Sequence, residues 1–226
     1  MVWIILFGIV IAVVALPGAW ASHVLKKHQI IDKTLQGTGG ELAEHLIERF
    51  NLTDVKLEES ETGDHYDPET KCVRLSAANM SGQTLTAVAT AAHEVGHALQ
   101  HQSAYGPILL RSRMVKIALV MEKLGSSAML IAPIAILLTR SPAIGGIFFG
   151  AALLSMLTLT VVHIVTLPVE FNASFGRALP LLREGYLTPE KIKIAEKILL
   201  ACALTYLAQS LASLLNLGRW LAVLRR

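Results

Sequence analysis

The sequence predicts a mainly α-helical integral membrane protein, with about four transmembrane helices and one small α+β domain on the cytoplasmic side. Two observations predict this class. Only 16% of the 226 residues are charged and 53% are hydrophobic, whereas about 25% are charged in an average soluble domain. The apolar residues also gather in long runs, each near the ~20 residues that a helix needs to cross a bilayer. The four runs are 2–21, 117–139, 141–167 and 198–218.

The first run, residues 2–21, contains no charged residue. A cleaved signal peptide is one interpretation, because Ala19-Trp20-Ala21 resembles a cleavage site. However, no Lys or Arg precedes the run, while Lys26, Lys27 and Lys33 follow it. Positive charges mark the cytoplasmic side of a span. We therefore favour an uncleaved anchor whose N-terminus lies outside.

Residues 34–110 are predicted to form the small domain. Apolar residues at helical spacing within Glu41–Phe50 predict a helix. Alternating apolar residues at Val55–Leu57 and Cys72–Leu75 predict a pair of short strands, joined through the polar turn region Glu58–Lys71. A strand at Cys72–Ser76 could pair with an extended substrate or could simply pack in the domain.

The second and third spans are predicted to form a hairpin through the short turn at 139–143. Residues 168–197 are charged again and should lie on the same side as the small domain. By the positive-inside rule that side is the cytoplasmic face of a bacterial plasma membrane, because it carries most of the basic residues. These are Lys26, Lys27, Lys33, Arg111, Arg113, Lys116, Arg177, Arg183, Lys191, Lys193 and Lys197, against Arg140, Arg219, Arg225 and Arg226 on the other side.

Charge and cysteine content exclude several classes. The net charge of +3 comes from scattered basic residues without interleaved aromatics, which indicates contact with a lipid bilayer and not with nucleic acid. Cys72 lies in the small domain and Cys202 in the last apolar run, so we expect two free thiols. Two cysteines alone cannot form a thiolate zinc site. The sequence does not predict an oligomeric state.

The segment Thr84–Gln102 is rich in alanine and free of proline, which predicts a helix. It contains the motif H-E-x-x-H at 93–97. Two histidines four residues apart lie on one helix face, where both imidazoles can bind one Zn²⁺ ion. Glu94 follows the first histidine, where a carboxylate can accept a proton from a water molecule that the metal activates.

A short motif can also occur by chance on a surface helix. Small apolar residues flank this one, however, as they would in a buried helix. Gly96 costs about 1 kcal/mol relative to alanine inside a helix, which indicates that another helix packs closely there. We therefore interpret the segment as the metal-binding helix of a zincin-like domain.

A catalytic zinc site needs a third protein ligand. The metzincin extension is excluded, because the chain has Gln100 and Ser103 where that class has glycine and histidine. His101 lies two turns from His93, and we expect it either to have a structural role or to face solvent. Glu170 is the best candidate, because the hairpin must return the end of the third span to the side of the histidines. The alternative is that Glu170 is an interfacial charge.

Four segments also carry a resemblance to a known family: Asp64–Pro68, Val73–Ser76, Ala91–Gln100 and Leu167–Phe171. In this order they resemble the YugP-like, membrane-bound neutral zinc metallopeptidases and, more distantly, HtpX and the CAAX-prenyl endopeptidases. The resemblance covers residues 38–178 and the layout of the spans. It implies a gluzincin-like membrane protease that acts on a protein or peptide substrate. His93, His97 and Glu170 would be the zinc ligands and Glu94 the general base.

The chain departs from both patterns near Glu170. The HtpX-like group has aspartate four residues after its ligand glutamate, where this chain has Ser174. The YugP-like pattern has aspartate two residues after it, where this chain has Asn172. Both positions are candidates for supporting the histidine ligands or the reacting oxyanion.

Further candidates for these supporting roles lie elsewhere in the chain. His65 and Tyr66 precede the second predicted strand but could simply cap a turn. Arg177 could instead anchor the membrane surface, and Tyr186 has no stronger claim. His163 lies inside the third span, two turns from Glu170, and polar groups at membrane depth are often functional.

Two rival functions remain open at this stage. A catalytically inactive zinc-binding scaffold or regulatory protein would keep the fold, although the intact motif and Glu170 argue against it. A small transporter would need polar residues converging within several spans, and only His163 and Glu122 are available. The sequence therefore favours a membrane-embedded zinc metalloprotease.

Overall fold

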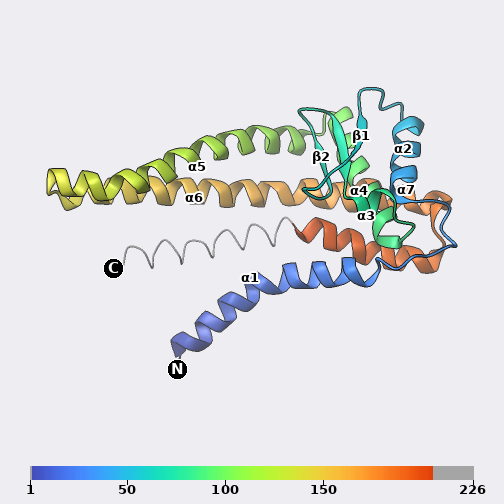
Figure 1. Ribbon diagram of the computed structural model, residues 1–226, viewed down its shortest axis with the longest axis horizontal. Helices are drawn as coiled ribbons and strands as arrows, with labels where there is room; N and C mark the ends of the chain where they lie inside the picture. The colour runs from blue at the N-terminus through green and yellow to red at the C-terminus, as the bar shows by residue number, and fades with distance from the viewer. Residues whose placement is uncertain (1, 206–226) are drawn as a thin grey trace.

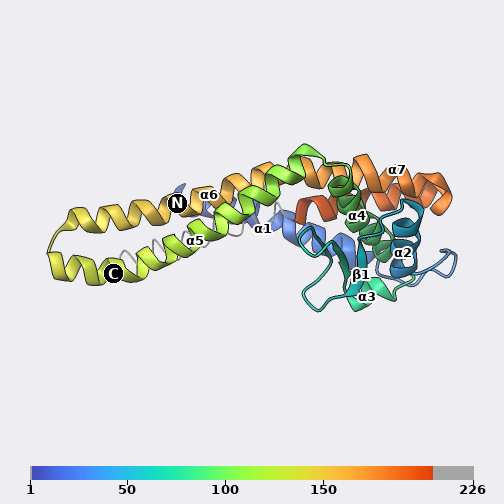
Figure 2. The same cartoon turned by 90° about the horizontal axis from the view of Figure 1, so that it is seen from above.

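The computed structural model describes residues 2–205, as a mostly helical chain with one small sheet. In Figures 1 and 2 a long helical hairpin projects from a compact end that contains the sheet. Side chains are described from residue 15 onwards. Within α6 (Pro142–Phe171), eight side chains are not described, and His163 is one of them. The fourth predicted span, at 198–218, lies mostly outside the described residues.

The hairpin consists of α5 (Gly106–Thr139) and α6 (Pro142–Phe171), joined at Arg140 and Ser141. The predicted turn is therefore confirmed, but both helices extend beyond the predicted spans towards the compact end. Gly125 allows the helices to approach closely, because an added Cβ would overlap Ser155. Glu170 consequently lies inside α6, in its last turn.

One helix within residues 2–205, α5, is long and apolar enough to cross a membrane. Its apolar side chains face outwards along much of its length, with Leu130, Leu137 and Leu138 each 77% to 78% exposed. Exposed apolar surface of this extent is typical of contact with lipid or with another chain. The first predicted span lies within α1 (Val2–Lys27).

The compact end contains α2 (Gly39–Arg49), the three strands and two further helices, α3 (Ala77–Met80) and α4 (Leu85–Gln102). The predicted helices at 41–50 and 84–102 are confirmed to within two residues. Thr38 caps α2 by accepting a hydrogen bond from the backbone N–H of Glu41, whose carboxylate accepts one from the backbone N–H of Thr38. This capping box explains why α2 begins at that point.

The sheet has three strands where the sequence predicted two. β1 (Lys56–Glu59) pairs in parallel with β3 (Cys72–Leu75), and β2 (His65–Asp67) pairs antiparallel with the other side of β3. β2 and the end of β1 lie within the predicted turn region, so that prediction was wrong for Glu58, Glu59 and His65–Asp67. Because both edges of β3 are occupied, Cys72–Leu75 cannot pair with a substrate. The outer strands are β1 and β2.

α4 forms the centre of the core, since every residue from Leu85 to Gln100 is buried. The C-terminal part of α1 covers it, and the Thr86 hydroxyl donates to the carbonyl oxygen of Leu25. After α6 the chain continues as the π-helical segment η1 (Asn172–Ala178), α7 (Leu179–Leu181), the π-helical turn η2 (Leu182–Tyr186) and a helix at 189–205. These segments pack around α4 and bring the end of α6 beside the H-E-x-x-H motif.

Gly96 is the closest point of this packing. A Cβ placed on Gly96 would lie 2.9 Å from the carbonyl oxygen of Ala173 in η1, which is closer than real Cβ atoms come. The prediction that a glycine here allows a neighbouring helix to pack closely is confirmed. The neighbour is the segment that directly follows Glu170.

Candidate metal centre

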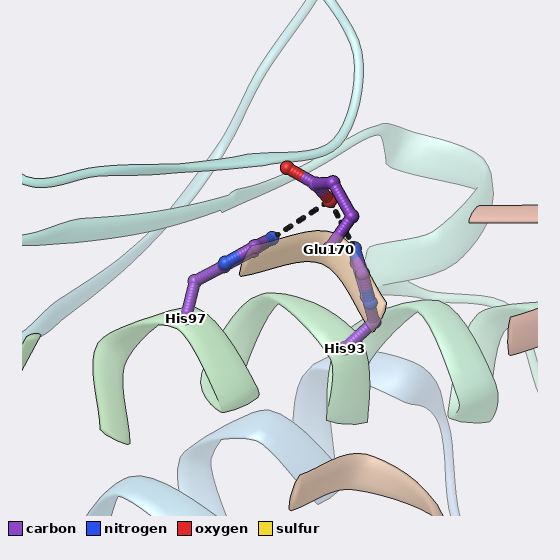
Figure 3. A group of neighbouring side chains, drawn as sticks. All are labelled: His93, His97 and Glu170. Carbon is purple, nitrogen blue, oxygen red and sulfur yellow. Dashed lines mark hydrogen bonds and ion pairs between the residues drawn. The ribbon is translucent and has the colours of Figure 1, made fainter. Parts of the chain in front are cut away.

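The two histidines of the motif lie one turn apart on the same buried face of α4. Their ring centroids are 4.7 Å apart, and the residues are 2% and 4% exposed. This separation follows from the i, i+4 spacing in a helix. Both rings point away from the α4 axis towards the last turn of α6, as Figure 3 shows.

Glu170 meets the histidines from α6. Its Oε2 atom lies 3.3 Å from Nε2 of His93 and 3.2 Å from Nε2 of His97, the two interactions drawn as dashed lines in Figure 3. Glu170 is fully buried. The three side chains, from helices about seventy residues apart in the sequence, offer ligand atoms that all lie within 4.8 Å of one another.

These distances suit a tetrahedral metal ion. Nitrogen and oxygen ligands about 2.0–2.1 Å from such an ion are separated from one another by about 3.3–3.4 Å. The contacts of Glu170 Oε2 with the two imidazoles have this length. Zinc prefers imidazole and carboxylate ligands of this kind.

Gln100 fixes the protonation of His97. The amide group of Gln100 donates through Nε2 to the carbonyl oxygen of Val169 and to Oδ1 of Asn172, at 2.8 and 2.9 Å. Its Oε1 atom therefore points at Nδ1 of His97, 3.0 Å away. Because an amide oxygen only accepts, His97 carries its proton on Nδ1 and presents the Nε2 lone pair to the site.

Ser174 does the same for His93. Its hydroxyl donates to the carbonyl oxygen of Leu199 at 2.9 Å, so its oxygen accepts from Nδ1 of His93, also at 2.9 Å. His93 thus presents its Nε2 lone pair as well. Asn172 and Ser174 are the two positions where the resemblance led us to expect an aspartate, and both provide hydrogen bonds around the histidines.

The result is a buried set of acceptors that face one another. Two Nε2 lone pairs and a carboxylate oxygen converge, and all three residues are buried. Buried acceptors that lack a donor destabilise a fold, and a divalent cation at the point of convergence would satisfy all three at once. The residues present therefore fit a zinc ion.

Arg111 completes the surroundings of Glu170. Its Nη1 atom donates to Oε1 of Glu170 at 2.9 Å, so that Oε2 is the oxygen that faces the histidines. The sequence indicated only that Arg111 belongs to the basic residues of the cytoplasmic side; its contact with Glu170 was missed, because 59 residues separate the pair. A buried carboxylate generally needs a cation beside it, and this rule could have directed attention to the basic residues near the end of the hairpin.

Gln100 was also assigned no role from the sequence. The sequence could have indicated a contact between the two side chains, since Gln100 follows His97 by three residues and so shares its helix face.

Glu94, the candidate base, lies in the same buried helix and is 7% exposed. Burial raises its pKa to about 7, and the nearby Glu170 carboxylate adds to the effect, while His93 opposes it.

The other supporting candidates have different surroundings. Nδ1 of His65 contacts the carbonyl oxygen of Gly63. The Tyr66 hydroxyl lies 2.8 Å from Nδ1 of His101, which fits the structural one of the two roles expected for that histidine. Arg177 donates to Ser103 at 3.0 Å.

Tyr186 was a further candidate, and it lies in a different cluster. Its hydroxyl accepts from Arg49 at 3.1 Å, and its ring packs edge-on against His45. Among the candidates whose side chains are described, Tyr66 lines a cavity that also reaches His97. The side chain of His163 lies outside the description.

Fold and site together define a mostly helical protein with a buried His-His-Glu group that could hold a metal ion. The chain belongs to the family described as "Putative neutral zinc metallopeptidase", whose model matches residues 3–225. It is 33% identical over 218 residues, and 90% of each chain, to the "Putative membrane protease YugP" of Bacillus subtilis (strain 168). No solved structure matches it. Zinc is the cofactor that this family and this ligand set imply.

Proposed function

We propose that the protein is a zinc-dependent protease of the membrane, which hydrolyses peptide bonds with Glu94 as general base. One observation carries the proposal. His93, His97 and Glu170 converge at metal-ligand distances, and the residue after the first histidine is a buried carboxylate. Zinc bound there would polarise a scissile carbonyl group and lower the pKa of a water molecule.

The protein's own residues then have separate tasks. His93 and His97 hold the metal through Nε2, because Ser174 and Gln100 engage their Nδ1 protons. Glu170 contributes Oε2 while Arg111 holds Oε1. Glu94 takes a proton from the attacking water and returns it to the leaving amine, the function of a general base and then a general acid. Burial suits Glu94 to this role, because it raises the pKa of the Glu94 carboxyl group to about 7, near neutral pH.

The rival function is an inactive zinc-binding scaffold, and one substitution distinguishes the two. We expect Glu94→Gln to bind about one zinc per chain, as the wild type does, and to lose hydrolysis of unfolded casein by at least about a hundredfold. Zinc in both proteins and hydrolysis by neither would favour the scaffold. Equal hydrolysis by both would remove Glu94 from the mechanism.

The ligand set is tested by metal content. We expect the detergent-purified Glu170→Ala variant to hold far less zinc than the wild type. Equal zinc in both would mean that another residue is the third ligand, with His65 and His101 the next to test. No zinc in either protein would overturn the proposal altogether.

We further propose that four helices span the bacterial plasma membrane, at 2–21, 117–139, 141–167 and 198–218, with the metal centre on the cytoplasmic side. The exposed apolar surface of α5 and the excess of basic residues beside the domain support this. A cysteine at Arg140 should then react with an impermeant maleimide in intact cells, and one at Glu61 should not. The reverse pattern would overturn the orientation.

A further inference from the structure

A cavity of about 710 Å³ lies beside the metal centre, between β2, α4 and the first turns of α5. This volume is within the usual range for ligand pockets, about 300–1,000 Å³. Two of its lining residues belong to the metal centre: His97, which faces Glu170, and Arg111, which holds the other oxygen of that carboxylate. The cavity is therefore continuous with the place where a scissile bond would lie.

The α5 wall of the cavity is largely apolar. The residues of α5 that line it are Ile108, Leu109, Arg111, Ser112, Val115, Lys116 and Leu119. The two cations among them are paired within the protein, Arg111 with Glu170 and Lys116 with Glu69. Ile108, Val115 and Leu119 follow one another at spacings of seven and four residues, which places them along one face of the helix. Val115 is half-buried, Ile108 is 4% exposed and Leu119 is 53% exposed, so the apolar wall begins deep in the domain and opens towards the surface.

The opposite wall is polar and held in place. Tyr66 contacts His101 through its hydroxyl, and Asp67 accepts from Arg74 and Thr70. Their polar groups are thus engaged with the protein itself. The apolar α5 wall is the surface on which a ligand can gain binding energy by burying its own apolar groups.

We propose that this cavity is the substrate subsite next to the scissile bond, an inference that rests on the proposed peptidase function. The subsite would select apolar side chains of a polypeptide through Val115 and its neighbours on α5. An extended peptide that crosses the metal centre beside His97 must place the adjoining side chains somewhere. The cavity is the space that borders both His97 and Arg111. Its one apolar wall determines which side chains fit.

Binding is measured without turnover, in the zinc-loaded Glu94→Gln protein. The probes are two short fluorescent peptides that differ only in a central leucine or aspartate. We expect the leucine peptide to bind at least about tenfold more tightly. Val115→Trp fills the cavity and should remove this preference. Val120→Trp is the matched control, because Val120 lies on α5, is 58% exposed and does not line the cavity.

A second variant covers the case in which Val115→Trp misfolds, as its zinc content would reveal. Val115→Ala enlarges the cavity and should shift the preference from leucine towards a tryptophan peptide. Equal binding of the leucine and aspartate peptides, or unchanged preferences in both Val115 variants, would overturn the subsite. The proposed function fails separately, if the zinc-loaded wild type binds the leucine peptide and never cleaves it.

Discussion

Arg111 and Glu170 form an ion pair between the two helices of the hairpin, with Nη1 and Oε1 2.9 Å apart. Glu170 is fully buried, and the side chain of Arg111 is 21% exposed. The pair joins the first turns of α5 to the last turn of α6, at the end of the hairpin that meets the domain. It leaves Oε2 of the same carboxylate for the histidines, so the hairpin and the metal centre are coupled through one residue.

Arg111→Gln should therefore weaken zinc binding. Glutamine can still donate one hydrogen bond but removes the charge that balances a buried carboxylate, and loss of such a supporting partner typically costs about 10–100-fold in metal affinity. Arg111→Lys keeps the charge and should lose less. Competition with a chromophoric chelator measures both affinities. Wild-type affinity in the glutamine variant would contradict the role given to Arg111.

Asn172 and Ser174 should respond differently to substitution. Asn172 accepts from Gln100 through Oδ1, an interaction that Asn172→Asp preserves and Asn172→Leu removes. We expect the aspartate variant to retain its zinc and the leucine variant to lose affinity about tenfold or more.

Ser174 both accepts from His93 and donates to Leu199. Ser174→Asp supplies an acceptor but no donor, and it places a carboxylate beside a carbonyl oxygen. It should therefore lower the thermal midpoint more than Ser174→Ala does. Thermal unfolding in detergent measures this difference, and the reverse order would show that an acceptor for Nδ1 of His93 matters more than the repulsion between a carboxylate and the Leu199 carbonyl oxygen.

The sequence predicted the parts of the fold that depend on local patterns. α4 was located to within one residue, because its alanine-rich segment lacks proline. β2 was missed, since a three-residue strand in a turn-rich segment forms only when β3 is present to pair with it. α6 continues to Phe171, beyond the end of the predicted third span at residue 167, because the chain stays helical through Pro168 and Glu170.

In the candidate site, too, the sequence predicted the residues that depend on local patterns and missed those that depend on long-range packing. His93, Glu94 and His97 follow from one local motif, and Glu170 follows from the geometry of a hairpin. The spacing of Gln100 from His97 places both on one helix face, but the bonds of Gln100 to α6 and the whole role of Arg111 arise only when α5, α6 and α4 pack together. Long-range contacts of buried polar groups are the part of a site that a single sequence conceals most completely.

Cys72 should be nearly inert in the folded protein. It is 1% exposed, and burial, assisted by the nearby Glu58, raises the pKa of its thiol to about 11. Since only the thiolate reacts, iodoacetamide at pH 8 should modify Cys72 about a hundredfold more slowly than an ordinary thiol. Mass spectrometry of native and detergent-denatured protein measures the two rates. Rapid labelling of the native protein would mean that β3 opens readily.

Gly96 supports the last prediction, which tests the packing between α4 and η1. In Gly96→Val the new Cβ would meet the Ala173 carbonyl oxygen, placed 2.9 Å away in the present packing, and a backbone atom cannot rotate aside. We expect a loss of roughly 1–3 kcal/mol of stability. Zinc content should fall as well, because η1 carries Asn172 and Ser174.

The control for Gly96 is Gly106→Val, at a position where an added Cβ meets no atom within 4 Å. Gly106 is the first residue of α5, whereas Gly96 lies inside α4. Because valine has a better helix propensity than glycine in a helix interior, a loss of stability in Gly96→Val reports on packing and not on helix propensity. Thermal unfolding and bound zinc are measured together. If Gly96→Val unfolds at the wild-type temperature with its full zinc content, the close contact between α4 and η1 is not what holds the two supporting residues against the histidines.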